Sequence, residues 1–218
     1  MAGLIVVGAG PLIGTSTARR FAADGLPVAL VARSEPTVRA AVEAVRGAAS
    51  VAVHGFVADV TDEPAIRAAL DEAVAAIGVP EVVLYNAAHV RYDALGELSA
   101  AQLLDTLAVN VVGGVTVAGH LAPAMVASGG GSLLFTGGMP EAKPGAASLS
   151  LGKAGLRTVA ELLHEQYGPQ GLHVATVTVS DVVAPGTAYD PDIIAEEFAA
   201  LHREPRDSWR REILFRRG

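Results

Sequence analysis

The chain has 218 residues, 51% of them hydrophobic and 18% charged, which is enough for one α/β domain with a substantial core. A net charge of −7 argues against nucleic acid or an anionic membrane as a partner, and the lack of cysteine excludes disulfides and thiol chemistry. Since neither a signal-peptide pattern nor an apolar run of membrane-spanning length is recognised, we expect a cytoplasmic protein.

Short β-branched runs alternate with longer alanine-rich segments. A seventh, short strand is expected within Arg210–Phe215, and helix starts are indicated at Thr61–Glu63, at the capping box Ser99–Gln102 and at Asp190–Pro191. The alternation predicts right-handed βαβ units. We therefore expect an α/β fold, a doubly wound Rossmann-type sandwich with a mostly parallel seven-stranded sheet and helices on both faces, as one domain over residues 1–218. The other predicted strands are Leu4–Val7, Val28–Val31, Val51–Val57, Val82–Tyr85, Ser132–Thr136 and Val174–Val179.

A glycine-rich turn follows the first predicted strand and opens a helix. Glycine lets the backbone turn sharply and approach a pyrophosphate, which then sits on the helix N-terminus. The position of the turn, directly after a strand at the start of a βαβ unit, makes a dinucleotide site the favoured interpretation over a tight turn without a ligand. The residues expected to contact the cofactor here are Gly8, Gly10, Leu12, Ile13 and Gly14.

This turn resembles the Thr-Gly-x-x-x-Gly-x-Gly fingerprint of the short-chain dehydrogenase/reductase family. Gly8 and Gly14 match two of its fixed positions, Val7 and Leu12 replace two others, and Gly10 stands in for the middle glycine. Further motifs follow in family order, so the resemblance covers almost the whole chain. It implies an NAD(P)-binding oxidoreductase with a small-molecule substrate.

The resemblance also implies a homodimer or homotetramer whose long helices pair across the subunit interface. Small residues on those helices, Gly113, Gly114 and Gly155, are expected to be exposed and to permit close approach of a second subunit.

The end of the second predicted strand favours NADP(H) over NAD(H). An NAD site would place an acid near Ala32, but Arg33 follows instead, and a guanidinium suits a 2′-phosphate. A solvated loop cation is the alternative for Arg33, as helix capping is for Asp59 and turn formation for Asn86. The resemblance implies further cofactor contacts from Asp59, Val60, Asn86, Ala87, Ala88, Ser180 and Val182.

The family's active site uses Asn, Ser, Tyr and Lys, in which lysine lowers the tyrosine pKa and binds the nicotinamide ribose. The resemblance places Asn110 at the first position, Thr136 at the second and Lys153 at the fourth. The alternatives are a helix-packing contact for Asn110, a buried strand-end residue for Thr136 and a surface charge for Lys153.

Leu149 stands at the tyrosine position, four residues before the lysine, and leucine cannot transfer a proton. No tyrosine lies between residues 92 and 167, so no shift of alignment supplies one. Tyr85 and His89 are expected near the substrate, although a surface loop position is favoured for His89. Val179-Ser180 replaces the family's Pro-Gly, and the segment that covers the substrate is shortened.

Two hypotheses remain. The first is an atypical oxidoreductase that transfers hydride between NADP(H) and a small carbonyl, alcohol or activated alkene, with its proton from Lys153, Thr136, water or a nearby side chain. The second is a non-catalytic NADP(H)-binding protein, either a sensor or the silent partner of a related subunit. No residue cluster suggests a metal site.

Overall fold

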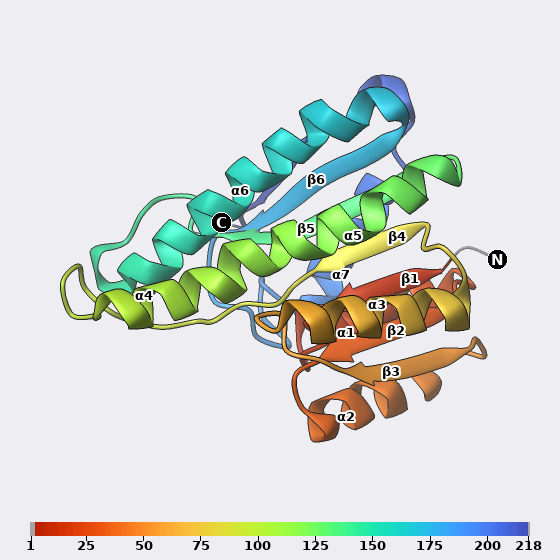
Figure 1. The fold of residues 1–218 in the computed structure, drawn as a ribbon, viewed down its shortest axis with the longest axis horizontal. Coiled ribbons are helices and arrows are strands. Elements are labelled where there is room, and N and C mark those ends of the chain that lie inside the picture. The colour runs from red at the N-terminus through yellow and green to blue at the C-terminus, as the bar shows by residue number, and fades with distance from the viewer. Residues whose placement is uncertain (1–2, 218) are drawn as a thin grey trace.

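The computed structural model describes residues 3–217, which form a three-layer α/β sandwich around a seven-stranded sheet (Figure 1). The strands pair in parallel in the order β3-β2-β1-β4-β5-β6-β7, so the predicted fold is confirmed and the sheet is wholly rather than mostly parallel. The strands are β1 (Leu4–Val7), β2 (Val28–Ala32), β3 (Val53–Val57), β4 (Val82–Tyr85), β5 (Gly131–Gly138), β6 (Leu172–Val179) and β7 (Glu212–Phe215).

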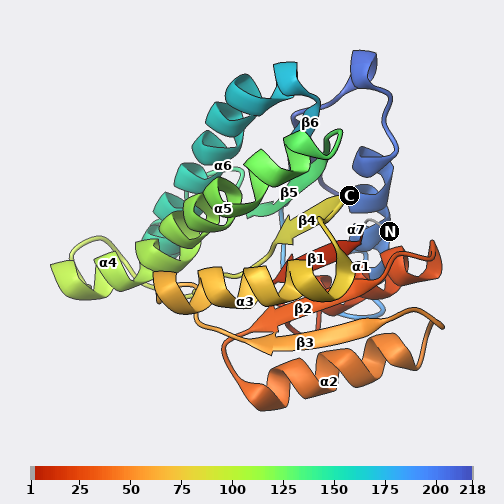
Figure 2. The ribbon, with the colours of Figure 1, turned by 45° about the vertical axis from the view of Figure 1, so that its right-hand side comes forward.

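Helices cover both faces of the sheet, and each face has its own apolar core (Figures 1 and 2). On one face α1, α2 and α7 pack through residues such as Phe21, Val45 and Phe198. On the other, α3, α5 and α6 pack through residues such as Leu70 and Leu121. The helices are α1 (Ile13–Ala23), α2 (Glu35–Arg46), α3 (Glu63–Ile77), α4 (Ala100–Leu107), α5 (Gly113–Ala127), α6 (Ala147–Tyr167) and α7 (Pro191–His202).

The predicted helix starts are confirmed by their caps. The Asp62 carboxylate accepts the Ala65 amide at 3.0 Å ahead of α3, and Ser99 and Gln102 form a reciprocal capping box ahead of α4. These side chains satisfy amides that the helix itself leaves without partners. Because all the strands are parallel, their carboxyl ends meet at one edge of the sheet, where the loops that lead to these helices begin.

One helix corrects the expectation that no apolar run reaches membrane-spanning length. A continuous helix from Ala100 to Ala127, formed by α4, the π-helical turn η1 (Ala108–Val112) and α5, is long and apolar enough to cross a membrane by length and composition. Its most apolar window has a mean hydropathy of 1.5 and is 44% buried. Val117 and Met125 of this helix are fully buried against the sheet, so its apolar character is accounted for by the core.

The glycines expected to open a face for a second subunit pack inside the chain instead. A Cβ on Gly113 would come within 2.4 Å of the Tyr85 hydroxyl, and one on Gly155 within 3.0 Å of a Val111 methyl group. Gly114 is buried in the same layer. The expectation was therefore wrong for these residues, because the small side chains bring α5 and α6 close to their own neighbours.

Candidate active site

The strand order reverses between β1 and β4, and a cleft of about 950 Å³ lies there at the carboxyl ends of the strands. Ligands of open parallel sheets bind at such a switch point, because the loops that follow the two central strands diverge there. Fourteen of the sixteen predicted site residues line the cleft, and Gly14 and Asn110 do not. Those that do are Gly8, Gly10, Leu12, Ile13, Arg33, Asp59, Val60, Asn86, Ala87, Ala88, Thr136, Lys153, Ser180 and Val182.

The glycine turn forms one end of the cleft, and its three glycines differ in their surroundings. Gly8 has φ +91°, and a Cβ there would lie 2.3 Å from the Ala87 nitrogen. A Cβ on Gly14 would lie 2.6 Å from the Gly8 oxygen, so Gly14 supports the turn from behind. Gly10 faces open space, and no side chain caps the start of α1. The turn therefore leaves backbone and helix amides accessible to a phosphate group.

Arg33 lies exposed where β2 ends, beside a carboxylate and two hydroxyl groups. The Thr61 amide donates to Asp59 at 2.9 Å and, with a smaller effect from the Arg33 charge, holds the pKa of Asp59 below its ordinary value. Ser34 and Thr37 share a hydrogen bond of 2.8 Å at the start of α2, and Thr37 lines the cleft. Sequence reasoning missed Thr37, although its place in the first turn of a helix after Arg33 was a usable signal.

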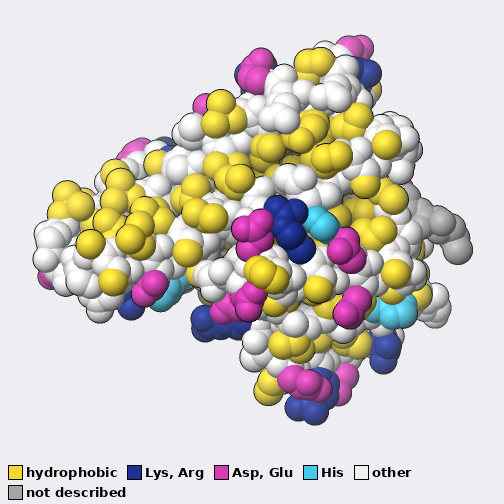
Figure 3. All heavy atoms as spheres, viewed as in Figure 1, with side chains coloured by type: hydrophobic (Ala, Val, Ile, Leu, Met, Phe, Trp, Pro, Cys, Tyr) yellow, Lys and Arg dark blue, Asp and Glu magenta, His cyan; other side chains and the backbone are white. Residues whose placement is uncertain are grey.

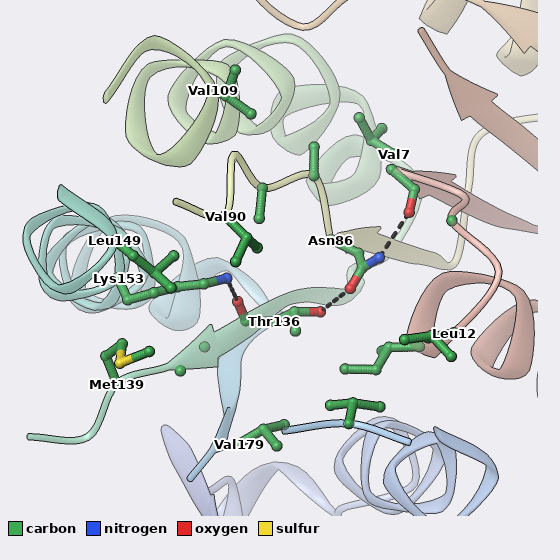
Figure 4. Close-up of a pocket in the computed structure, with 18 of the residues that line it drawn as sticks. Val7, Leu12, Asn86, Val90, Val109, Thr136, Met139, Leu149, Lys153 and Val179 are labelled. Carbon is green, nitrogen blue, oxygen red and sulfur yellow. Dashed lines mark hydrogen bonds between the residues drawn. The ribbon is translucent and has the colours of Figure 1, made fainter. Parts of the chain in front are cut away.

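A chain of hydrogen bonds connects three strand ends across the middle of the cleft (Figure 4). The Thr136 hydroxyl donates to the Asn86 side-chain oxygen at 2.8 Å, and the Asn86 amide donates to the Gly8 oxygen at 2.7 Å. The Thr136 hydrogen is thus directed to Asn86, whereas the sequence had suggested Thr136 as a source of the proton. In this arrangement Thr136 and Asn86 together hold the turn.

Lys153 of α6 reaches into the opposite end of the cleft. Its ammonium group donates to the Thr136 backbone oxygen at 2.7 Å, and its side chain is buried. Burial and, second, the charge of Arg157 lower the pKa of Lys153 to about 8. An ammonium group has three hydrogens, so two remain for a ligand beside Lys153.

Two positions beside Lys153, Leu149 and Gly138, bear no hydroxyl group. Leu149, one turn earlier on α6, is buried and lines the cleft. At the end of β5, a Cβ added to Gly138 would lie 3.6 Å from Cε of Lys153, an ordinary contact distance. Gly138, not Thr136, is therefore the β5 residue whose side-chain position faces the lysine.

Asn110 lies in η1 and is fully buried. Its side-chain oxygen accepts the His89 amide at 2.6 Å, and its amide group donates to the His89 oxygen at 3.1 Å. A Cβ on Gly152 would come within 2.7 Å of Cβ of Asn110, so glycine lets α6 pack against this turn. Asn110 thus holds the loop that follows β4, and its side chain does not reach the cleft.

Two other candidates for proton transfer do not face the cleft. The Tyr85 hydroxyl donates to the Val109 backbone oxygen at 2.5 Å, and burial raises the pKa of Tyr85 well above its ordinary value. His89 is absent from the cleft lining, although Ala88 and Val90 on either side of it are present. Neither Tyr85 nor His89 is placed to act on a ligand beside Lys153.

Sequence reasoning missed several residues that line the cleft, among them Val90, Tyr92 and Met139. It also missed Asp93, whose carboxylate accepts both the amide and the hydroxyl of Ser148 and so anchors the β4–α4 loop to the start of α6. The two partners are 55 residues apart, so no local pattern announces the pair.

Ser180 and Val182 follow β6 at the rim of the cleft. The Ser180 hydroxyl pairs with the Phe215 backbone oxygen and the Tyr189 hydroxyl, each at 3.0 Å, while Val182 is 69% exposed. The Ser180 side chain therefore ties the loop to β7, so any contact with a ligand is left to its backbone.

A family model described as short chain dehydrogenase matches residues 3–192 of this chain. The chain belongs to the short-chain dehydrogenase family. Its oxidoreductase class, inferred above from the glycine turn and the motifs that follow it, is confirmed by this match and by relatives named as dehydrogenases and reductases.

Two curated relatives illustrate the similarity. A probable galactose dehydrogenase, GalD of Rhizobium meliloti (strain 1021), is 31% identical over 83% of this chain and 72% of its own length. The short-chain reductase protein NovJ of Streptomyces niveus is 32% identical over 94% of this chain and 75% of its own.

Solved structures agree closely in fold. A short-chain dehydrogenase from Rhodopseudomonas palustris superposes with a TM-score of 0.87 at 26% identity, covering 97% of this chain and 96% of that one. A metagenomic short-chain oxidoreductase, solved in complex with NADP, has a TM-score of 0.88 at 25% identity with the same coverage.

Proposed function

We propose that this short-chain dehydrogenase transfers hydride between NADP(H) and a small carbonyl, alcohol or activated-alkene substrate without the tyrosine acid that the family uses. The observation that carries the proposal is the end of the cleft opposite the glycine turn, where the buried Lys153 side chain lies beside Gly138 and one helical turn after Leu149. A retained lysine without its usual partners indicates an altered proton donor.

The residues of the cleft fit a nicotinamide dinucleotide. Gly10 and the uncapped start of α1 offer amides to the pyrophosphate, and the Arg33 guanidinium, with the hydroxyl of Thr37 near it, suits the 2′-phosphate of NADP(H). The NADP complex of the metagenomic relative supports the same cofactor. When bound, the cofactor supplies or accepts the hydride.

Lys153 provides the proton in the reduction. Its ammonium form donates one hydrogen to the Thr136 oxygen and directs another at the substrate oxygen. With the cofactor bound, the carbonyl carbon would accept a hydride while the π electron pair of the C=O group takes this proton to form the O–H bond. The neutral amine would then regain a proton from water. A lysine with a pKa of about 8 is near the range in which an acid works best at neutral pH.

The absence of the tyrosine at position 149 also favours a second function. Neither Leu149 nor Gly138 offers a hydroxyl group beside Lys153, as expected for a protein that binds NADP(H) without turnover. In this alternative, Lys153 holds the nicotinamide ribose and the protein acts as a sensor or as the silent partner of a related subunit.

Cofactor binding and turnover separate these functions. NADPH is expected to raise the melting temperature more than NADH does, and no shift with either would contradict both functions. NADPH oxidation is then followed over a panel of aldehydes, ketones and enones. Turnover that Lys153→Ala abolishes supports the enzyme, whereas binding without turnover, even in the Leu149→Tyr/Gly138→Ser double variant, supports the sensor.

The proposal includes a homodimer or homotetramer. Hydrophobic side chains gather over α4 and the outer side of α5 and α6 (yellow in Figure 3), including Leu104 and Leu162, which are each 65% exposed. Such a patch on a water-soluble surface favours a partner. Light scattering should show an oligomer that Leu104→Arg/Leu162→Arg dissociates and the loop variant Leu95→Arg does not.

A further inference from the structure

The turn that follows β5 contains an unusual backbone conformation. Among residues 3–217, Met139 is the one residue other than glycine with a positive φ, at 48°. This left-handed conformation disfavours a side chain by about 1 kcal/mol or more, so it persists only where surrounding contacts impose it. The strain lies at the cleft, since Met139 is one of its lining residues.

Arg157 of α6 holds this turn. Its guanidinium donates to the Gly138 oxygen at 2.7 Å and to the Met139 oxygen at 3.2 Å. Lys153, one helical turn earlier, donates to the Thr136 oxygen of the same strand. Two cations of α6 therefore bind carbonyl groups at the end of β5 and just beyond it, and they fix the direction in which the chain leaves the sheet.

The side chain of Met139 stands at the lysine end of the cleft. Figure 4 shows it near Lys153 and Leu149, on the far side of Thr136 from Leu12 of the glycine turn. Val90 also lines the cleft, so Val90, Leu149 and Met139 supply apolar surface on the side of Lys153. A thioether side chain is flexible and polarisable, and it packs well against hydrocarbon groups of different shape.

We propose that Met139 is a specificity-determining residue and Arg157 its positioning residue, which together select substrates with a hydrocarbon group on the reacting carbon. By holding the Gly138–Met139 turn, Arg157 directs Met139 toward the substrate instead of solvent. This inference rests on the proposed function, since it assigns the lysine end of the cleft to the substrate.

The test measures binding and does not depend on turnover. A series of 2-ketones from acetone to 2-octanone is titrated into the NADP⁺-saturated protein and followed by calorimetry. Each added methylene is expected to tighten binding by up to about threefold to fourfold while apolar contact lasts. Met139→Gly, which accepts the positive φ, and Met139→Asn, which tolerates it and is polar, should both flatten this trend and weaken 2-octanone binding by about tenfold.

Arg157→Met should flatten the trend as Met139→Gly does, while Arg157→Lys restores part of it. Combining Arg157→Met with Met139→Gly should add nothing further for 2-octanone, because both changes remove the same contact. Arg211→Met is the matched control, since Arg211 pairs with Glu165 on the surface, away from the turn.

The outcomes distinguish this inference from the proposed function. Chain-length dependence that the variants abolish, without turnover of any carbonyl, would sink the proposed enzyme and leave the inference standing. Equal affinity for all ketones, no ketone binding at all, or an Arg157→Met protein that loses stability but keeps the wild-type trend would overturn the inference.

Discussion

Lys153 bears a titratable amine at a buried position. Because burial and the Arg157 charge lower its pKa to about 8, the folded protein holds this proton less tightly than the unfolded chain, in which a lysine titrates near 10.5. Between these two values the unfolded state binds more protons, so the free energy of unfolding rises with pH. Below pH 8 the buried ammonium group therefore lowers the free energy of unfolding.

The lowered pKa of Lys153 predicts a pH-dependent difference in stability between the wild type and Lys153→Met. From pH 7 to pH 10 the wild type should gain about 2 kcal/mol relative to the variant, since each pKa unit corresponds to about 1.4 kcal/mol. Urea denaturation of both proteins across this range measures the difference, and the other titrating groups cancel. A constant difference would mean that the Lys153 pKa is ordinary.

The same pKa predicts opposite pH profiles for the two directions of catalysis. Carbonyl reduction should slow as pH rises through about 8, because the ammonium donor is lost, and alcohol oxidation should speed up, because the neutral amine accepts a proton. The kcat/KM profiles report these midpoints. In Arg157→Gln both midpoints should move to higher pH, since a neighbouring positive charge is removed; an unmoved midpoint would point to another donor.

Asn86 is the residue on which the glycine turn depends most directly. Its replacement by alanine leaves the Gly8 oxygen and the Thr136 hydroxyl without their partner, which costs about 1–3 kcal/mol for groups buried from water. Denaturation should show this loss, and NADPH titration should show weaker binding. Unchanged binding in a destabilised Asn86→Ala protein would separate the hydrogen bonds from the cofactor site.

At the scale of elements, the glycine turn could be predicted from local sequence patterns and η1 could not. The turn, its helix and the caps of α3 and α4 were predicted from the sequence because each depends on residues close together in the chain. The π-helical turn around Asn110 was not, since it forms where Gly152 of α6 lets a distant helix approach. Such turns often occur at functional sites, where they redirect one side chain.

Two alanine variants test the glycine turn as an element. Gly10→Ala should keep the wild-type melting temperature, since its Cβ meets nothing within 4 Å, and should weaken NADPH binding by occupying the space near the phosphates. Gly8→Ala should destabilise the fold itself, because φ is +91° and the Cβ would lie 2.3 Å from the Ala87 nitrogen. Melting curves with and without NADPH distinguish the two effects, and equal NADPH affinity in Gly10→Ala would place the pyrophosphate elsewhere.

At the scale of the whole molecule, the cleft joins both halves of the sheet. Its lining comes from the ends of β1 and β2 on one side of the switch point and from the loop after β4 and the ends of β5 and β6 on the other. A ligand in the cleft therefore stabilises both halves together, in keeping with the prediction of a single domain.

Calorimetry should accordingly show one cooperative unfolding transition, and NADPH should raise the temperature of the whole transition. At a concentration one hundred times its Kd, NADPH adds about 2.7 kcal/mol, which for a chain of this length corresponds to a rise of about 5–10 °C. Two transitions, of which NADPH shifts only one, would contradict the single domain. The cytoplasmic location stays a prediction.

The sequence by itself determined the α/β fold, the order of its elements and fourteen of the residues that line the cleft, because strand periodicity, caps and a glycine turn are local signals. Only the tertiary structure decided what those residues touch. In the folded chain, Thr136 donates to Asn86, and Asn110 holds the loop after β4. Gly138 lies beside Lys153, and Arg157 binds the backbone oxygen of Met139. These pairs join positions between 18 and 50 residues apart, or a glycine to a distant side chain, and no spacing rule along the chain encodes such contacts.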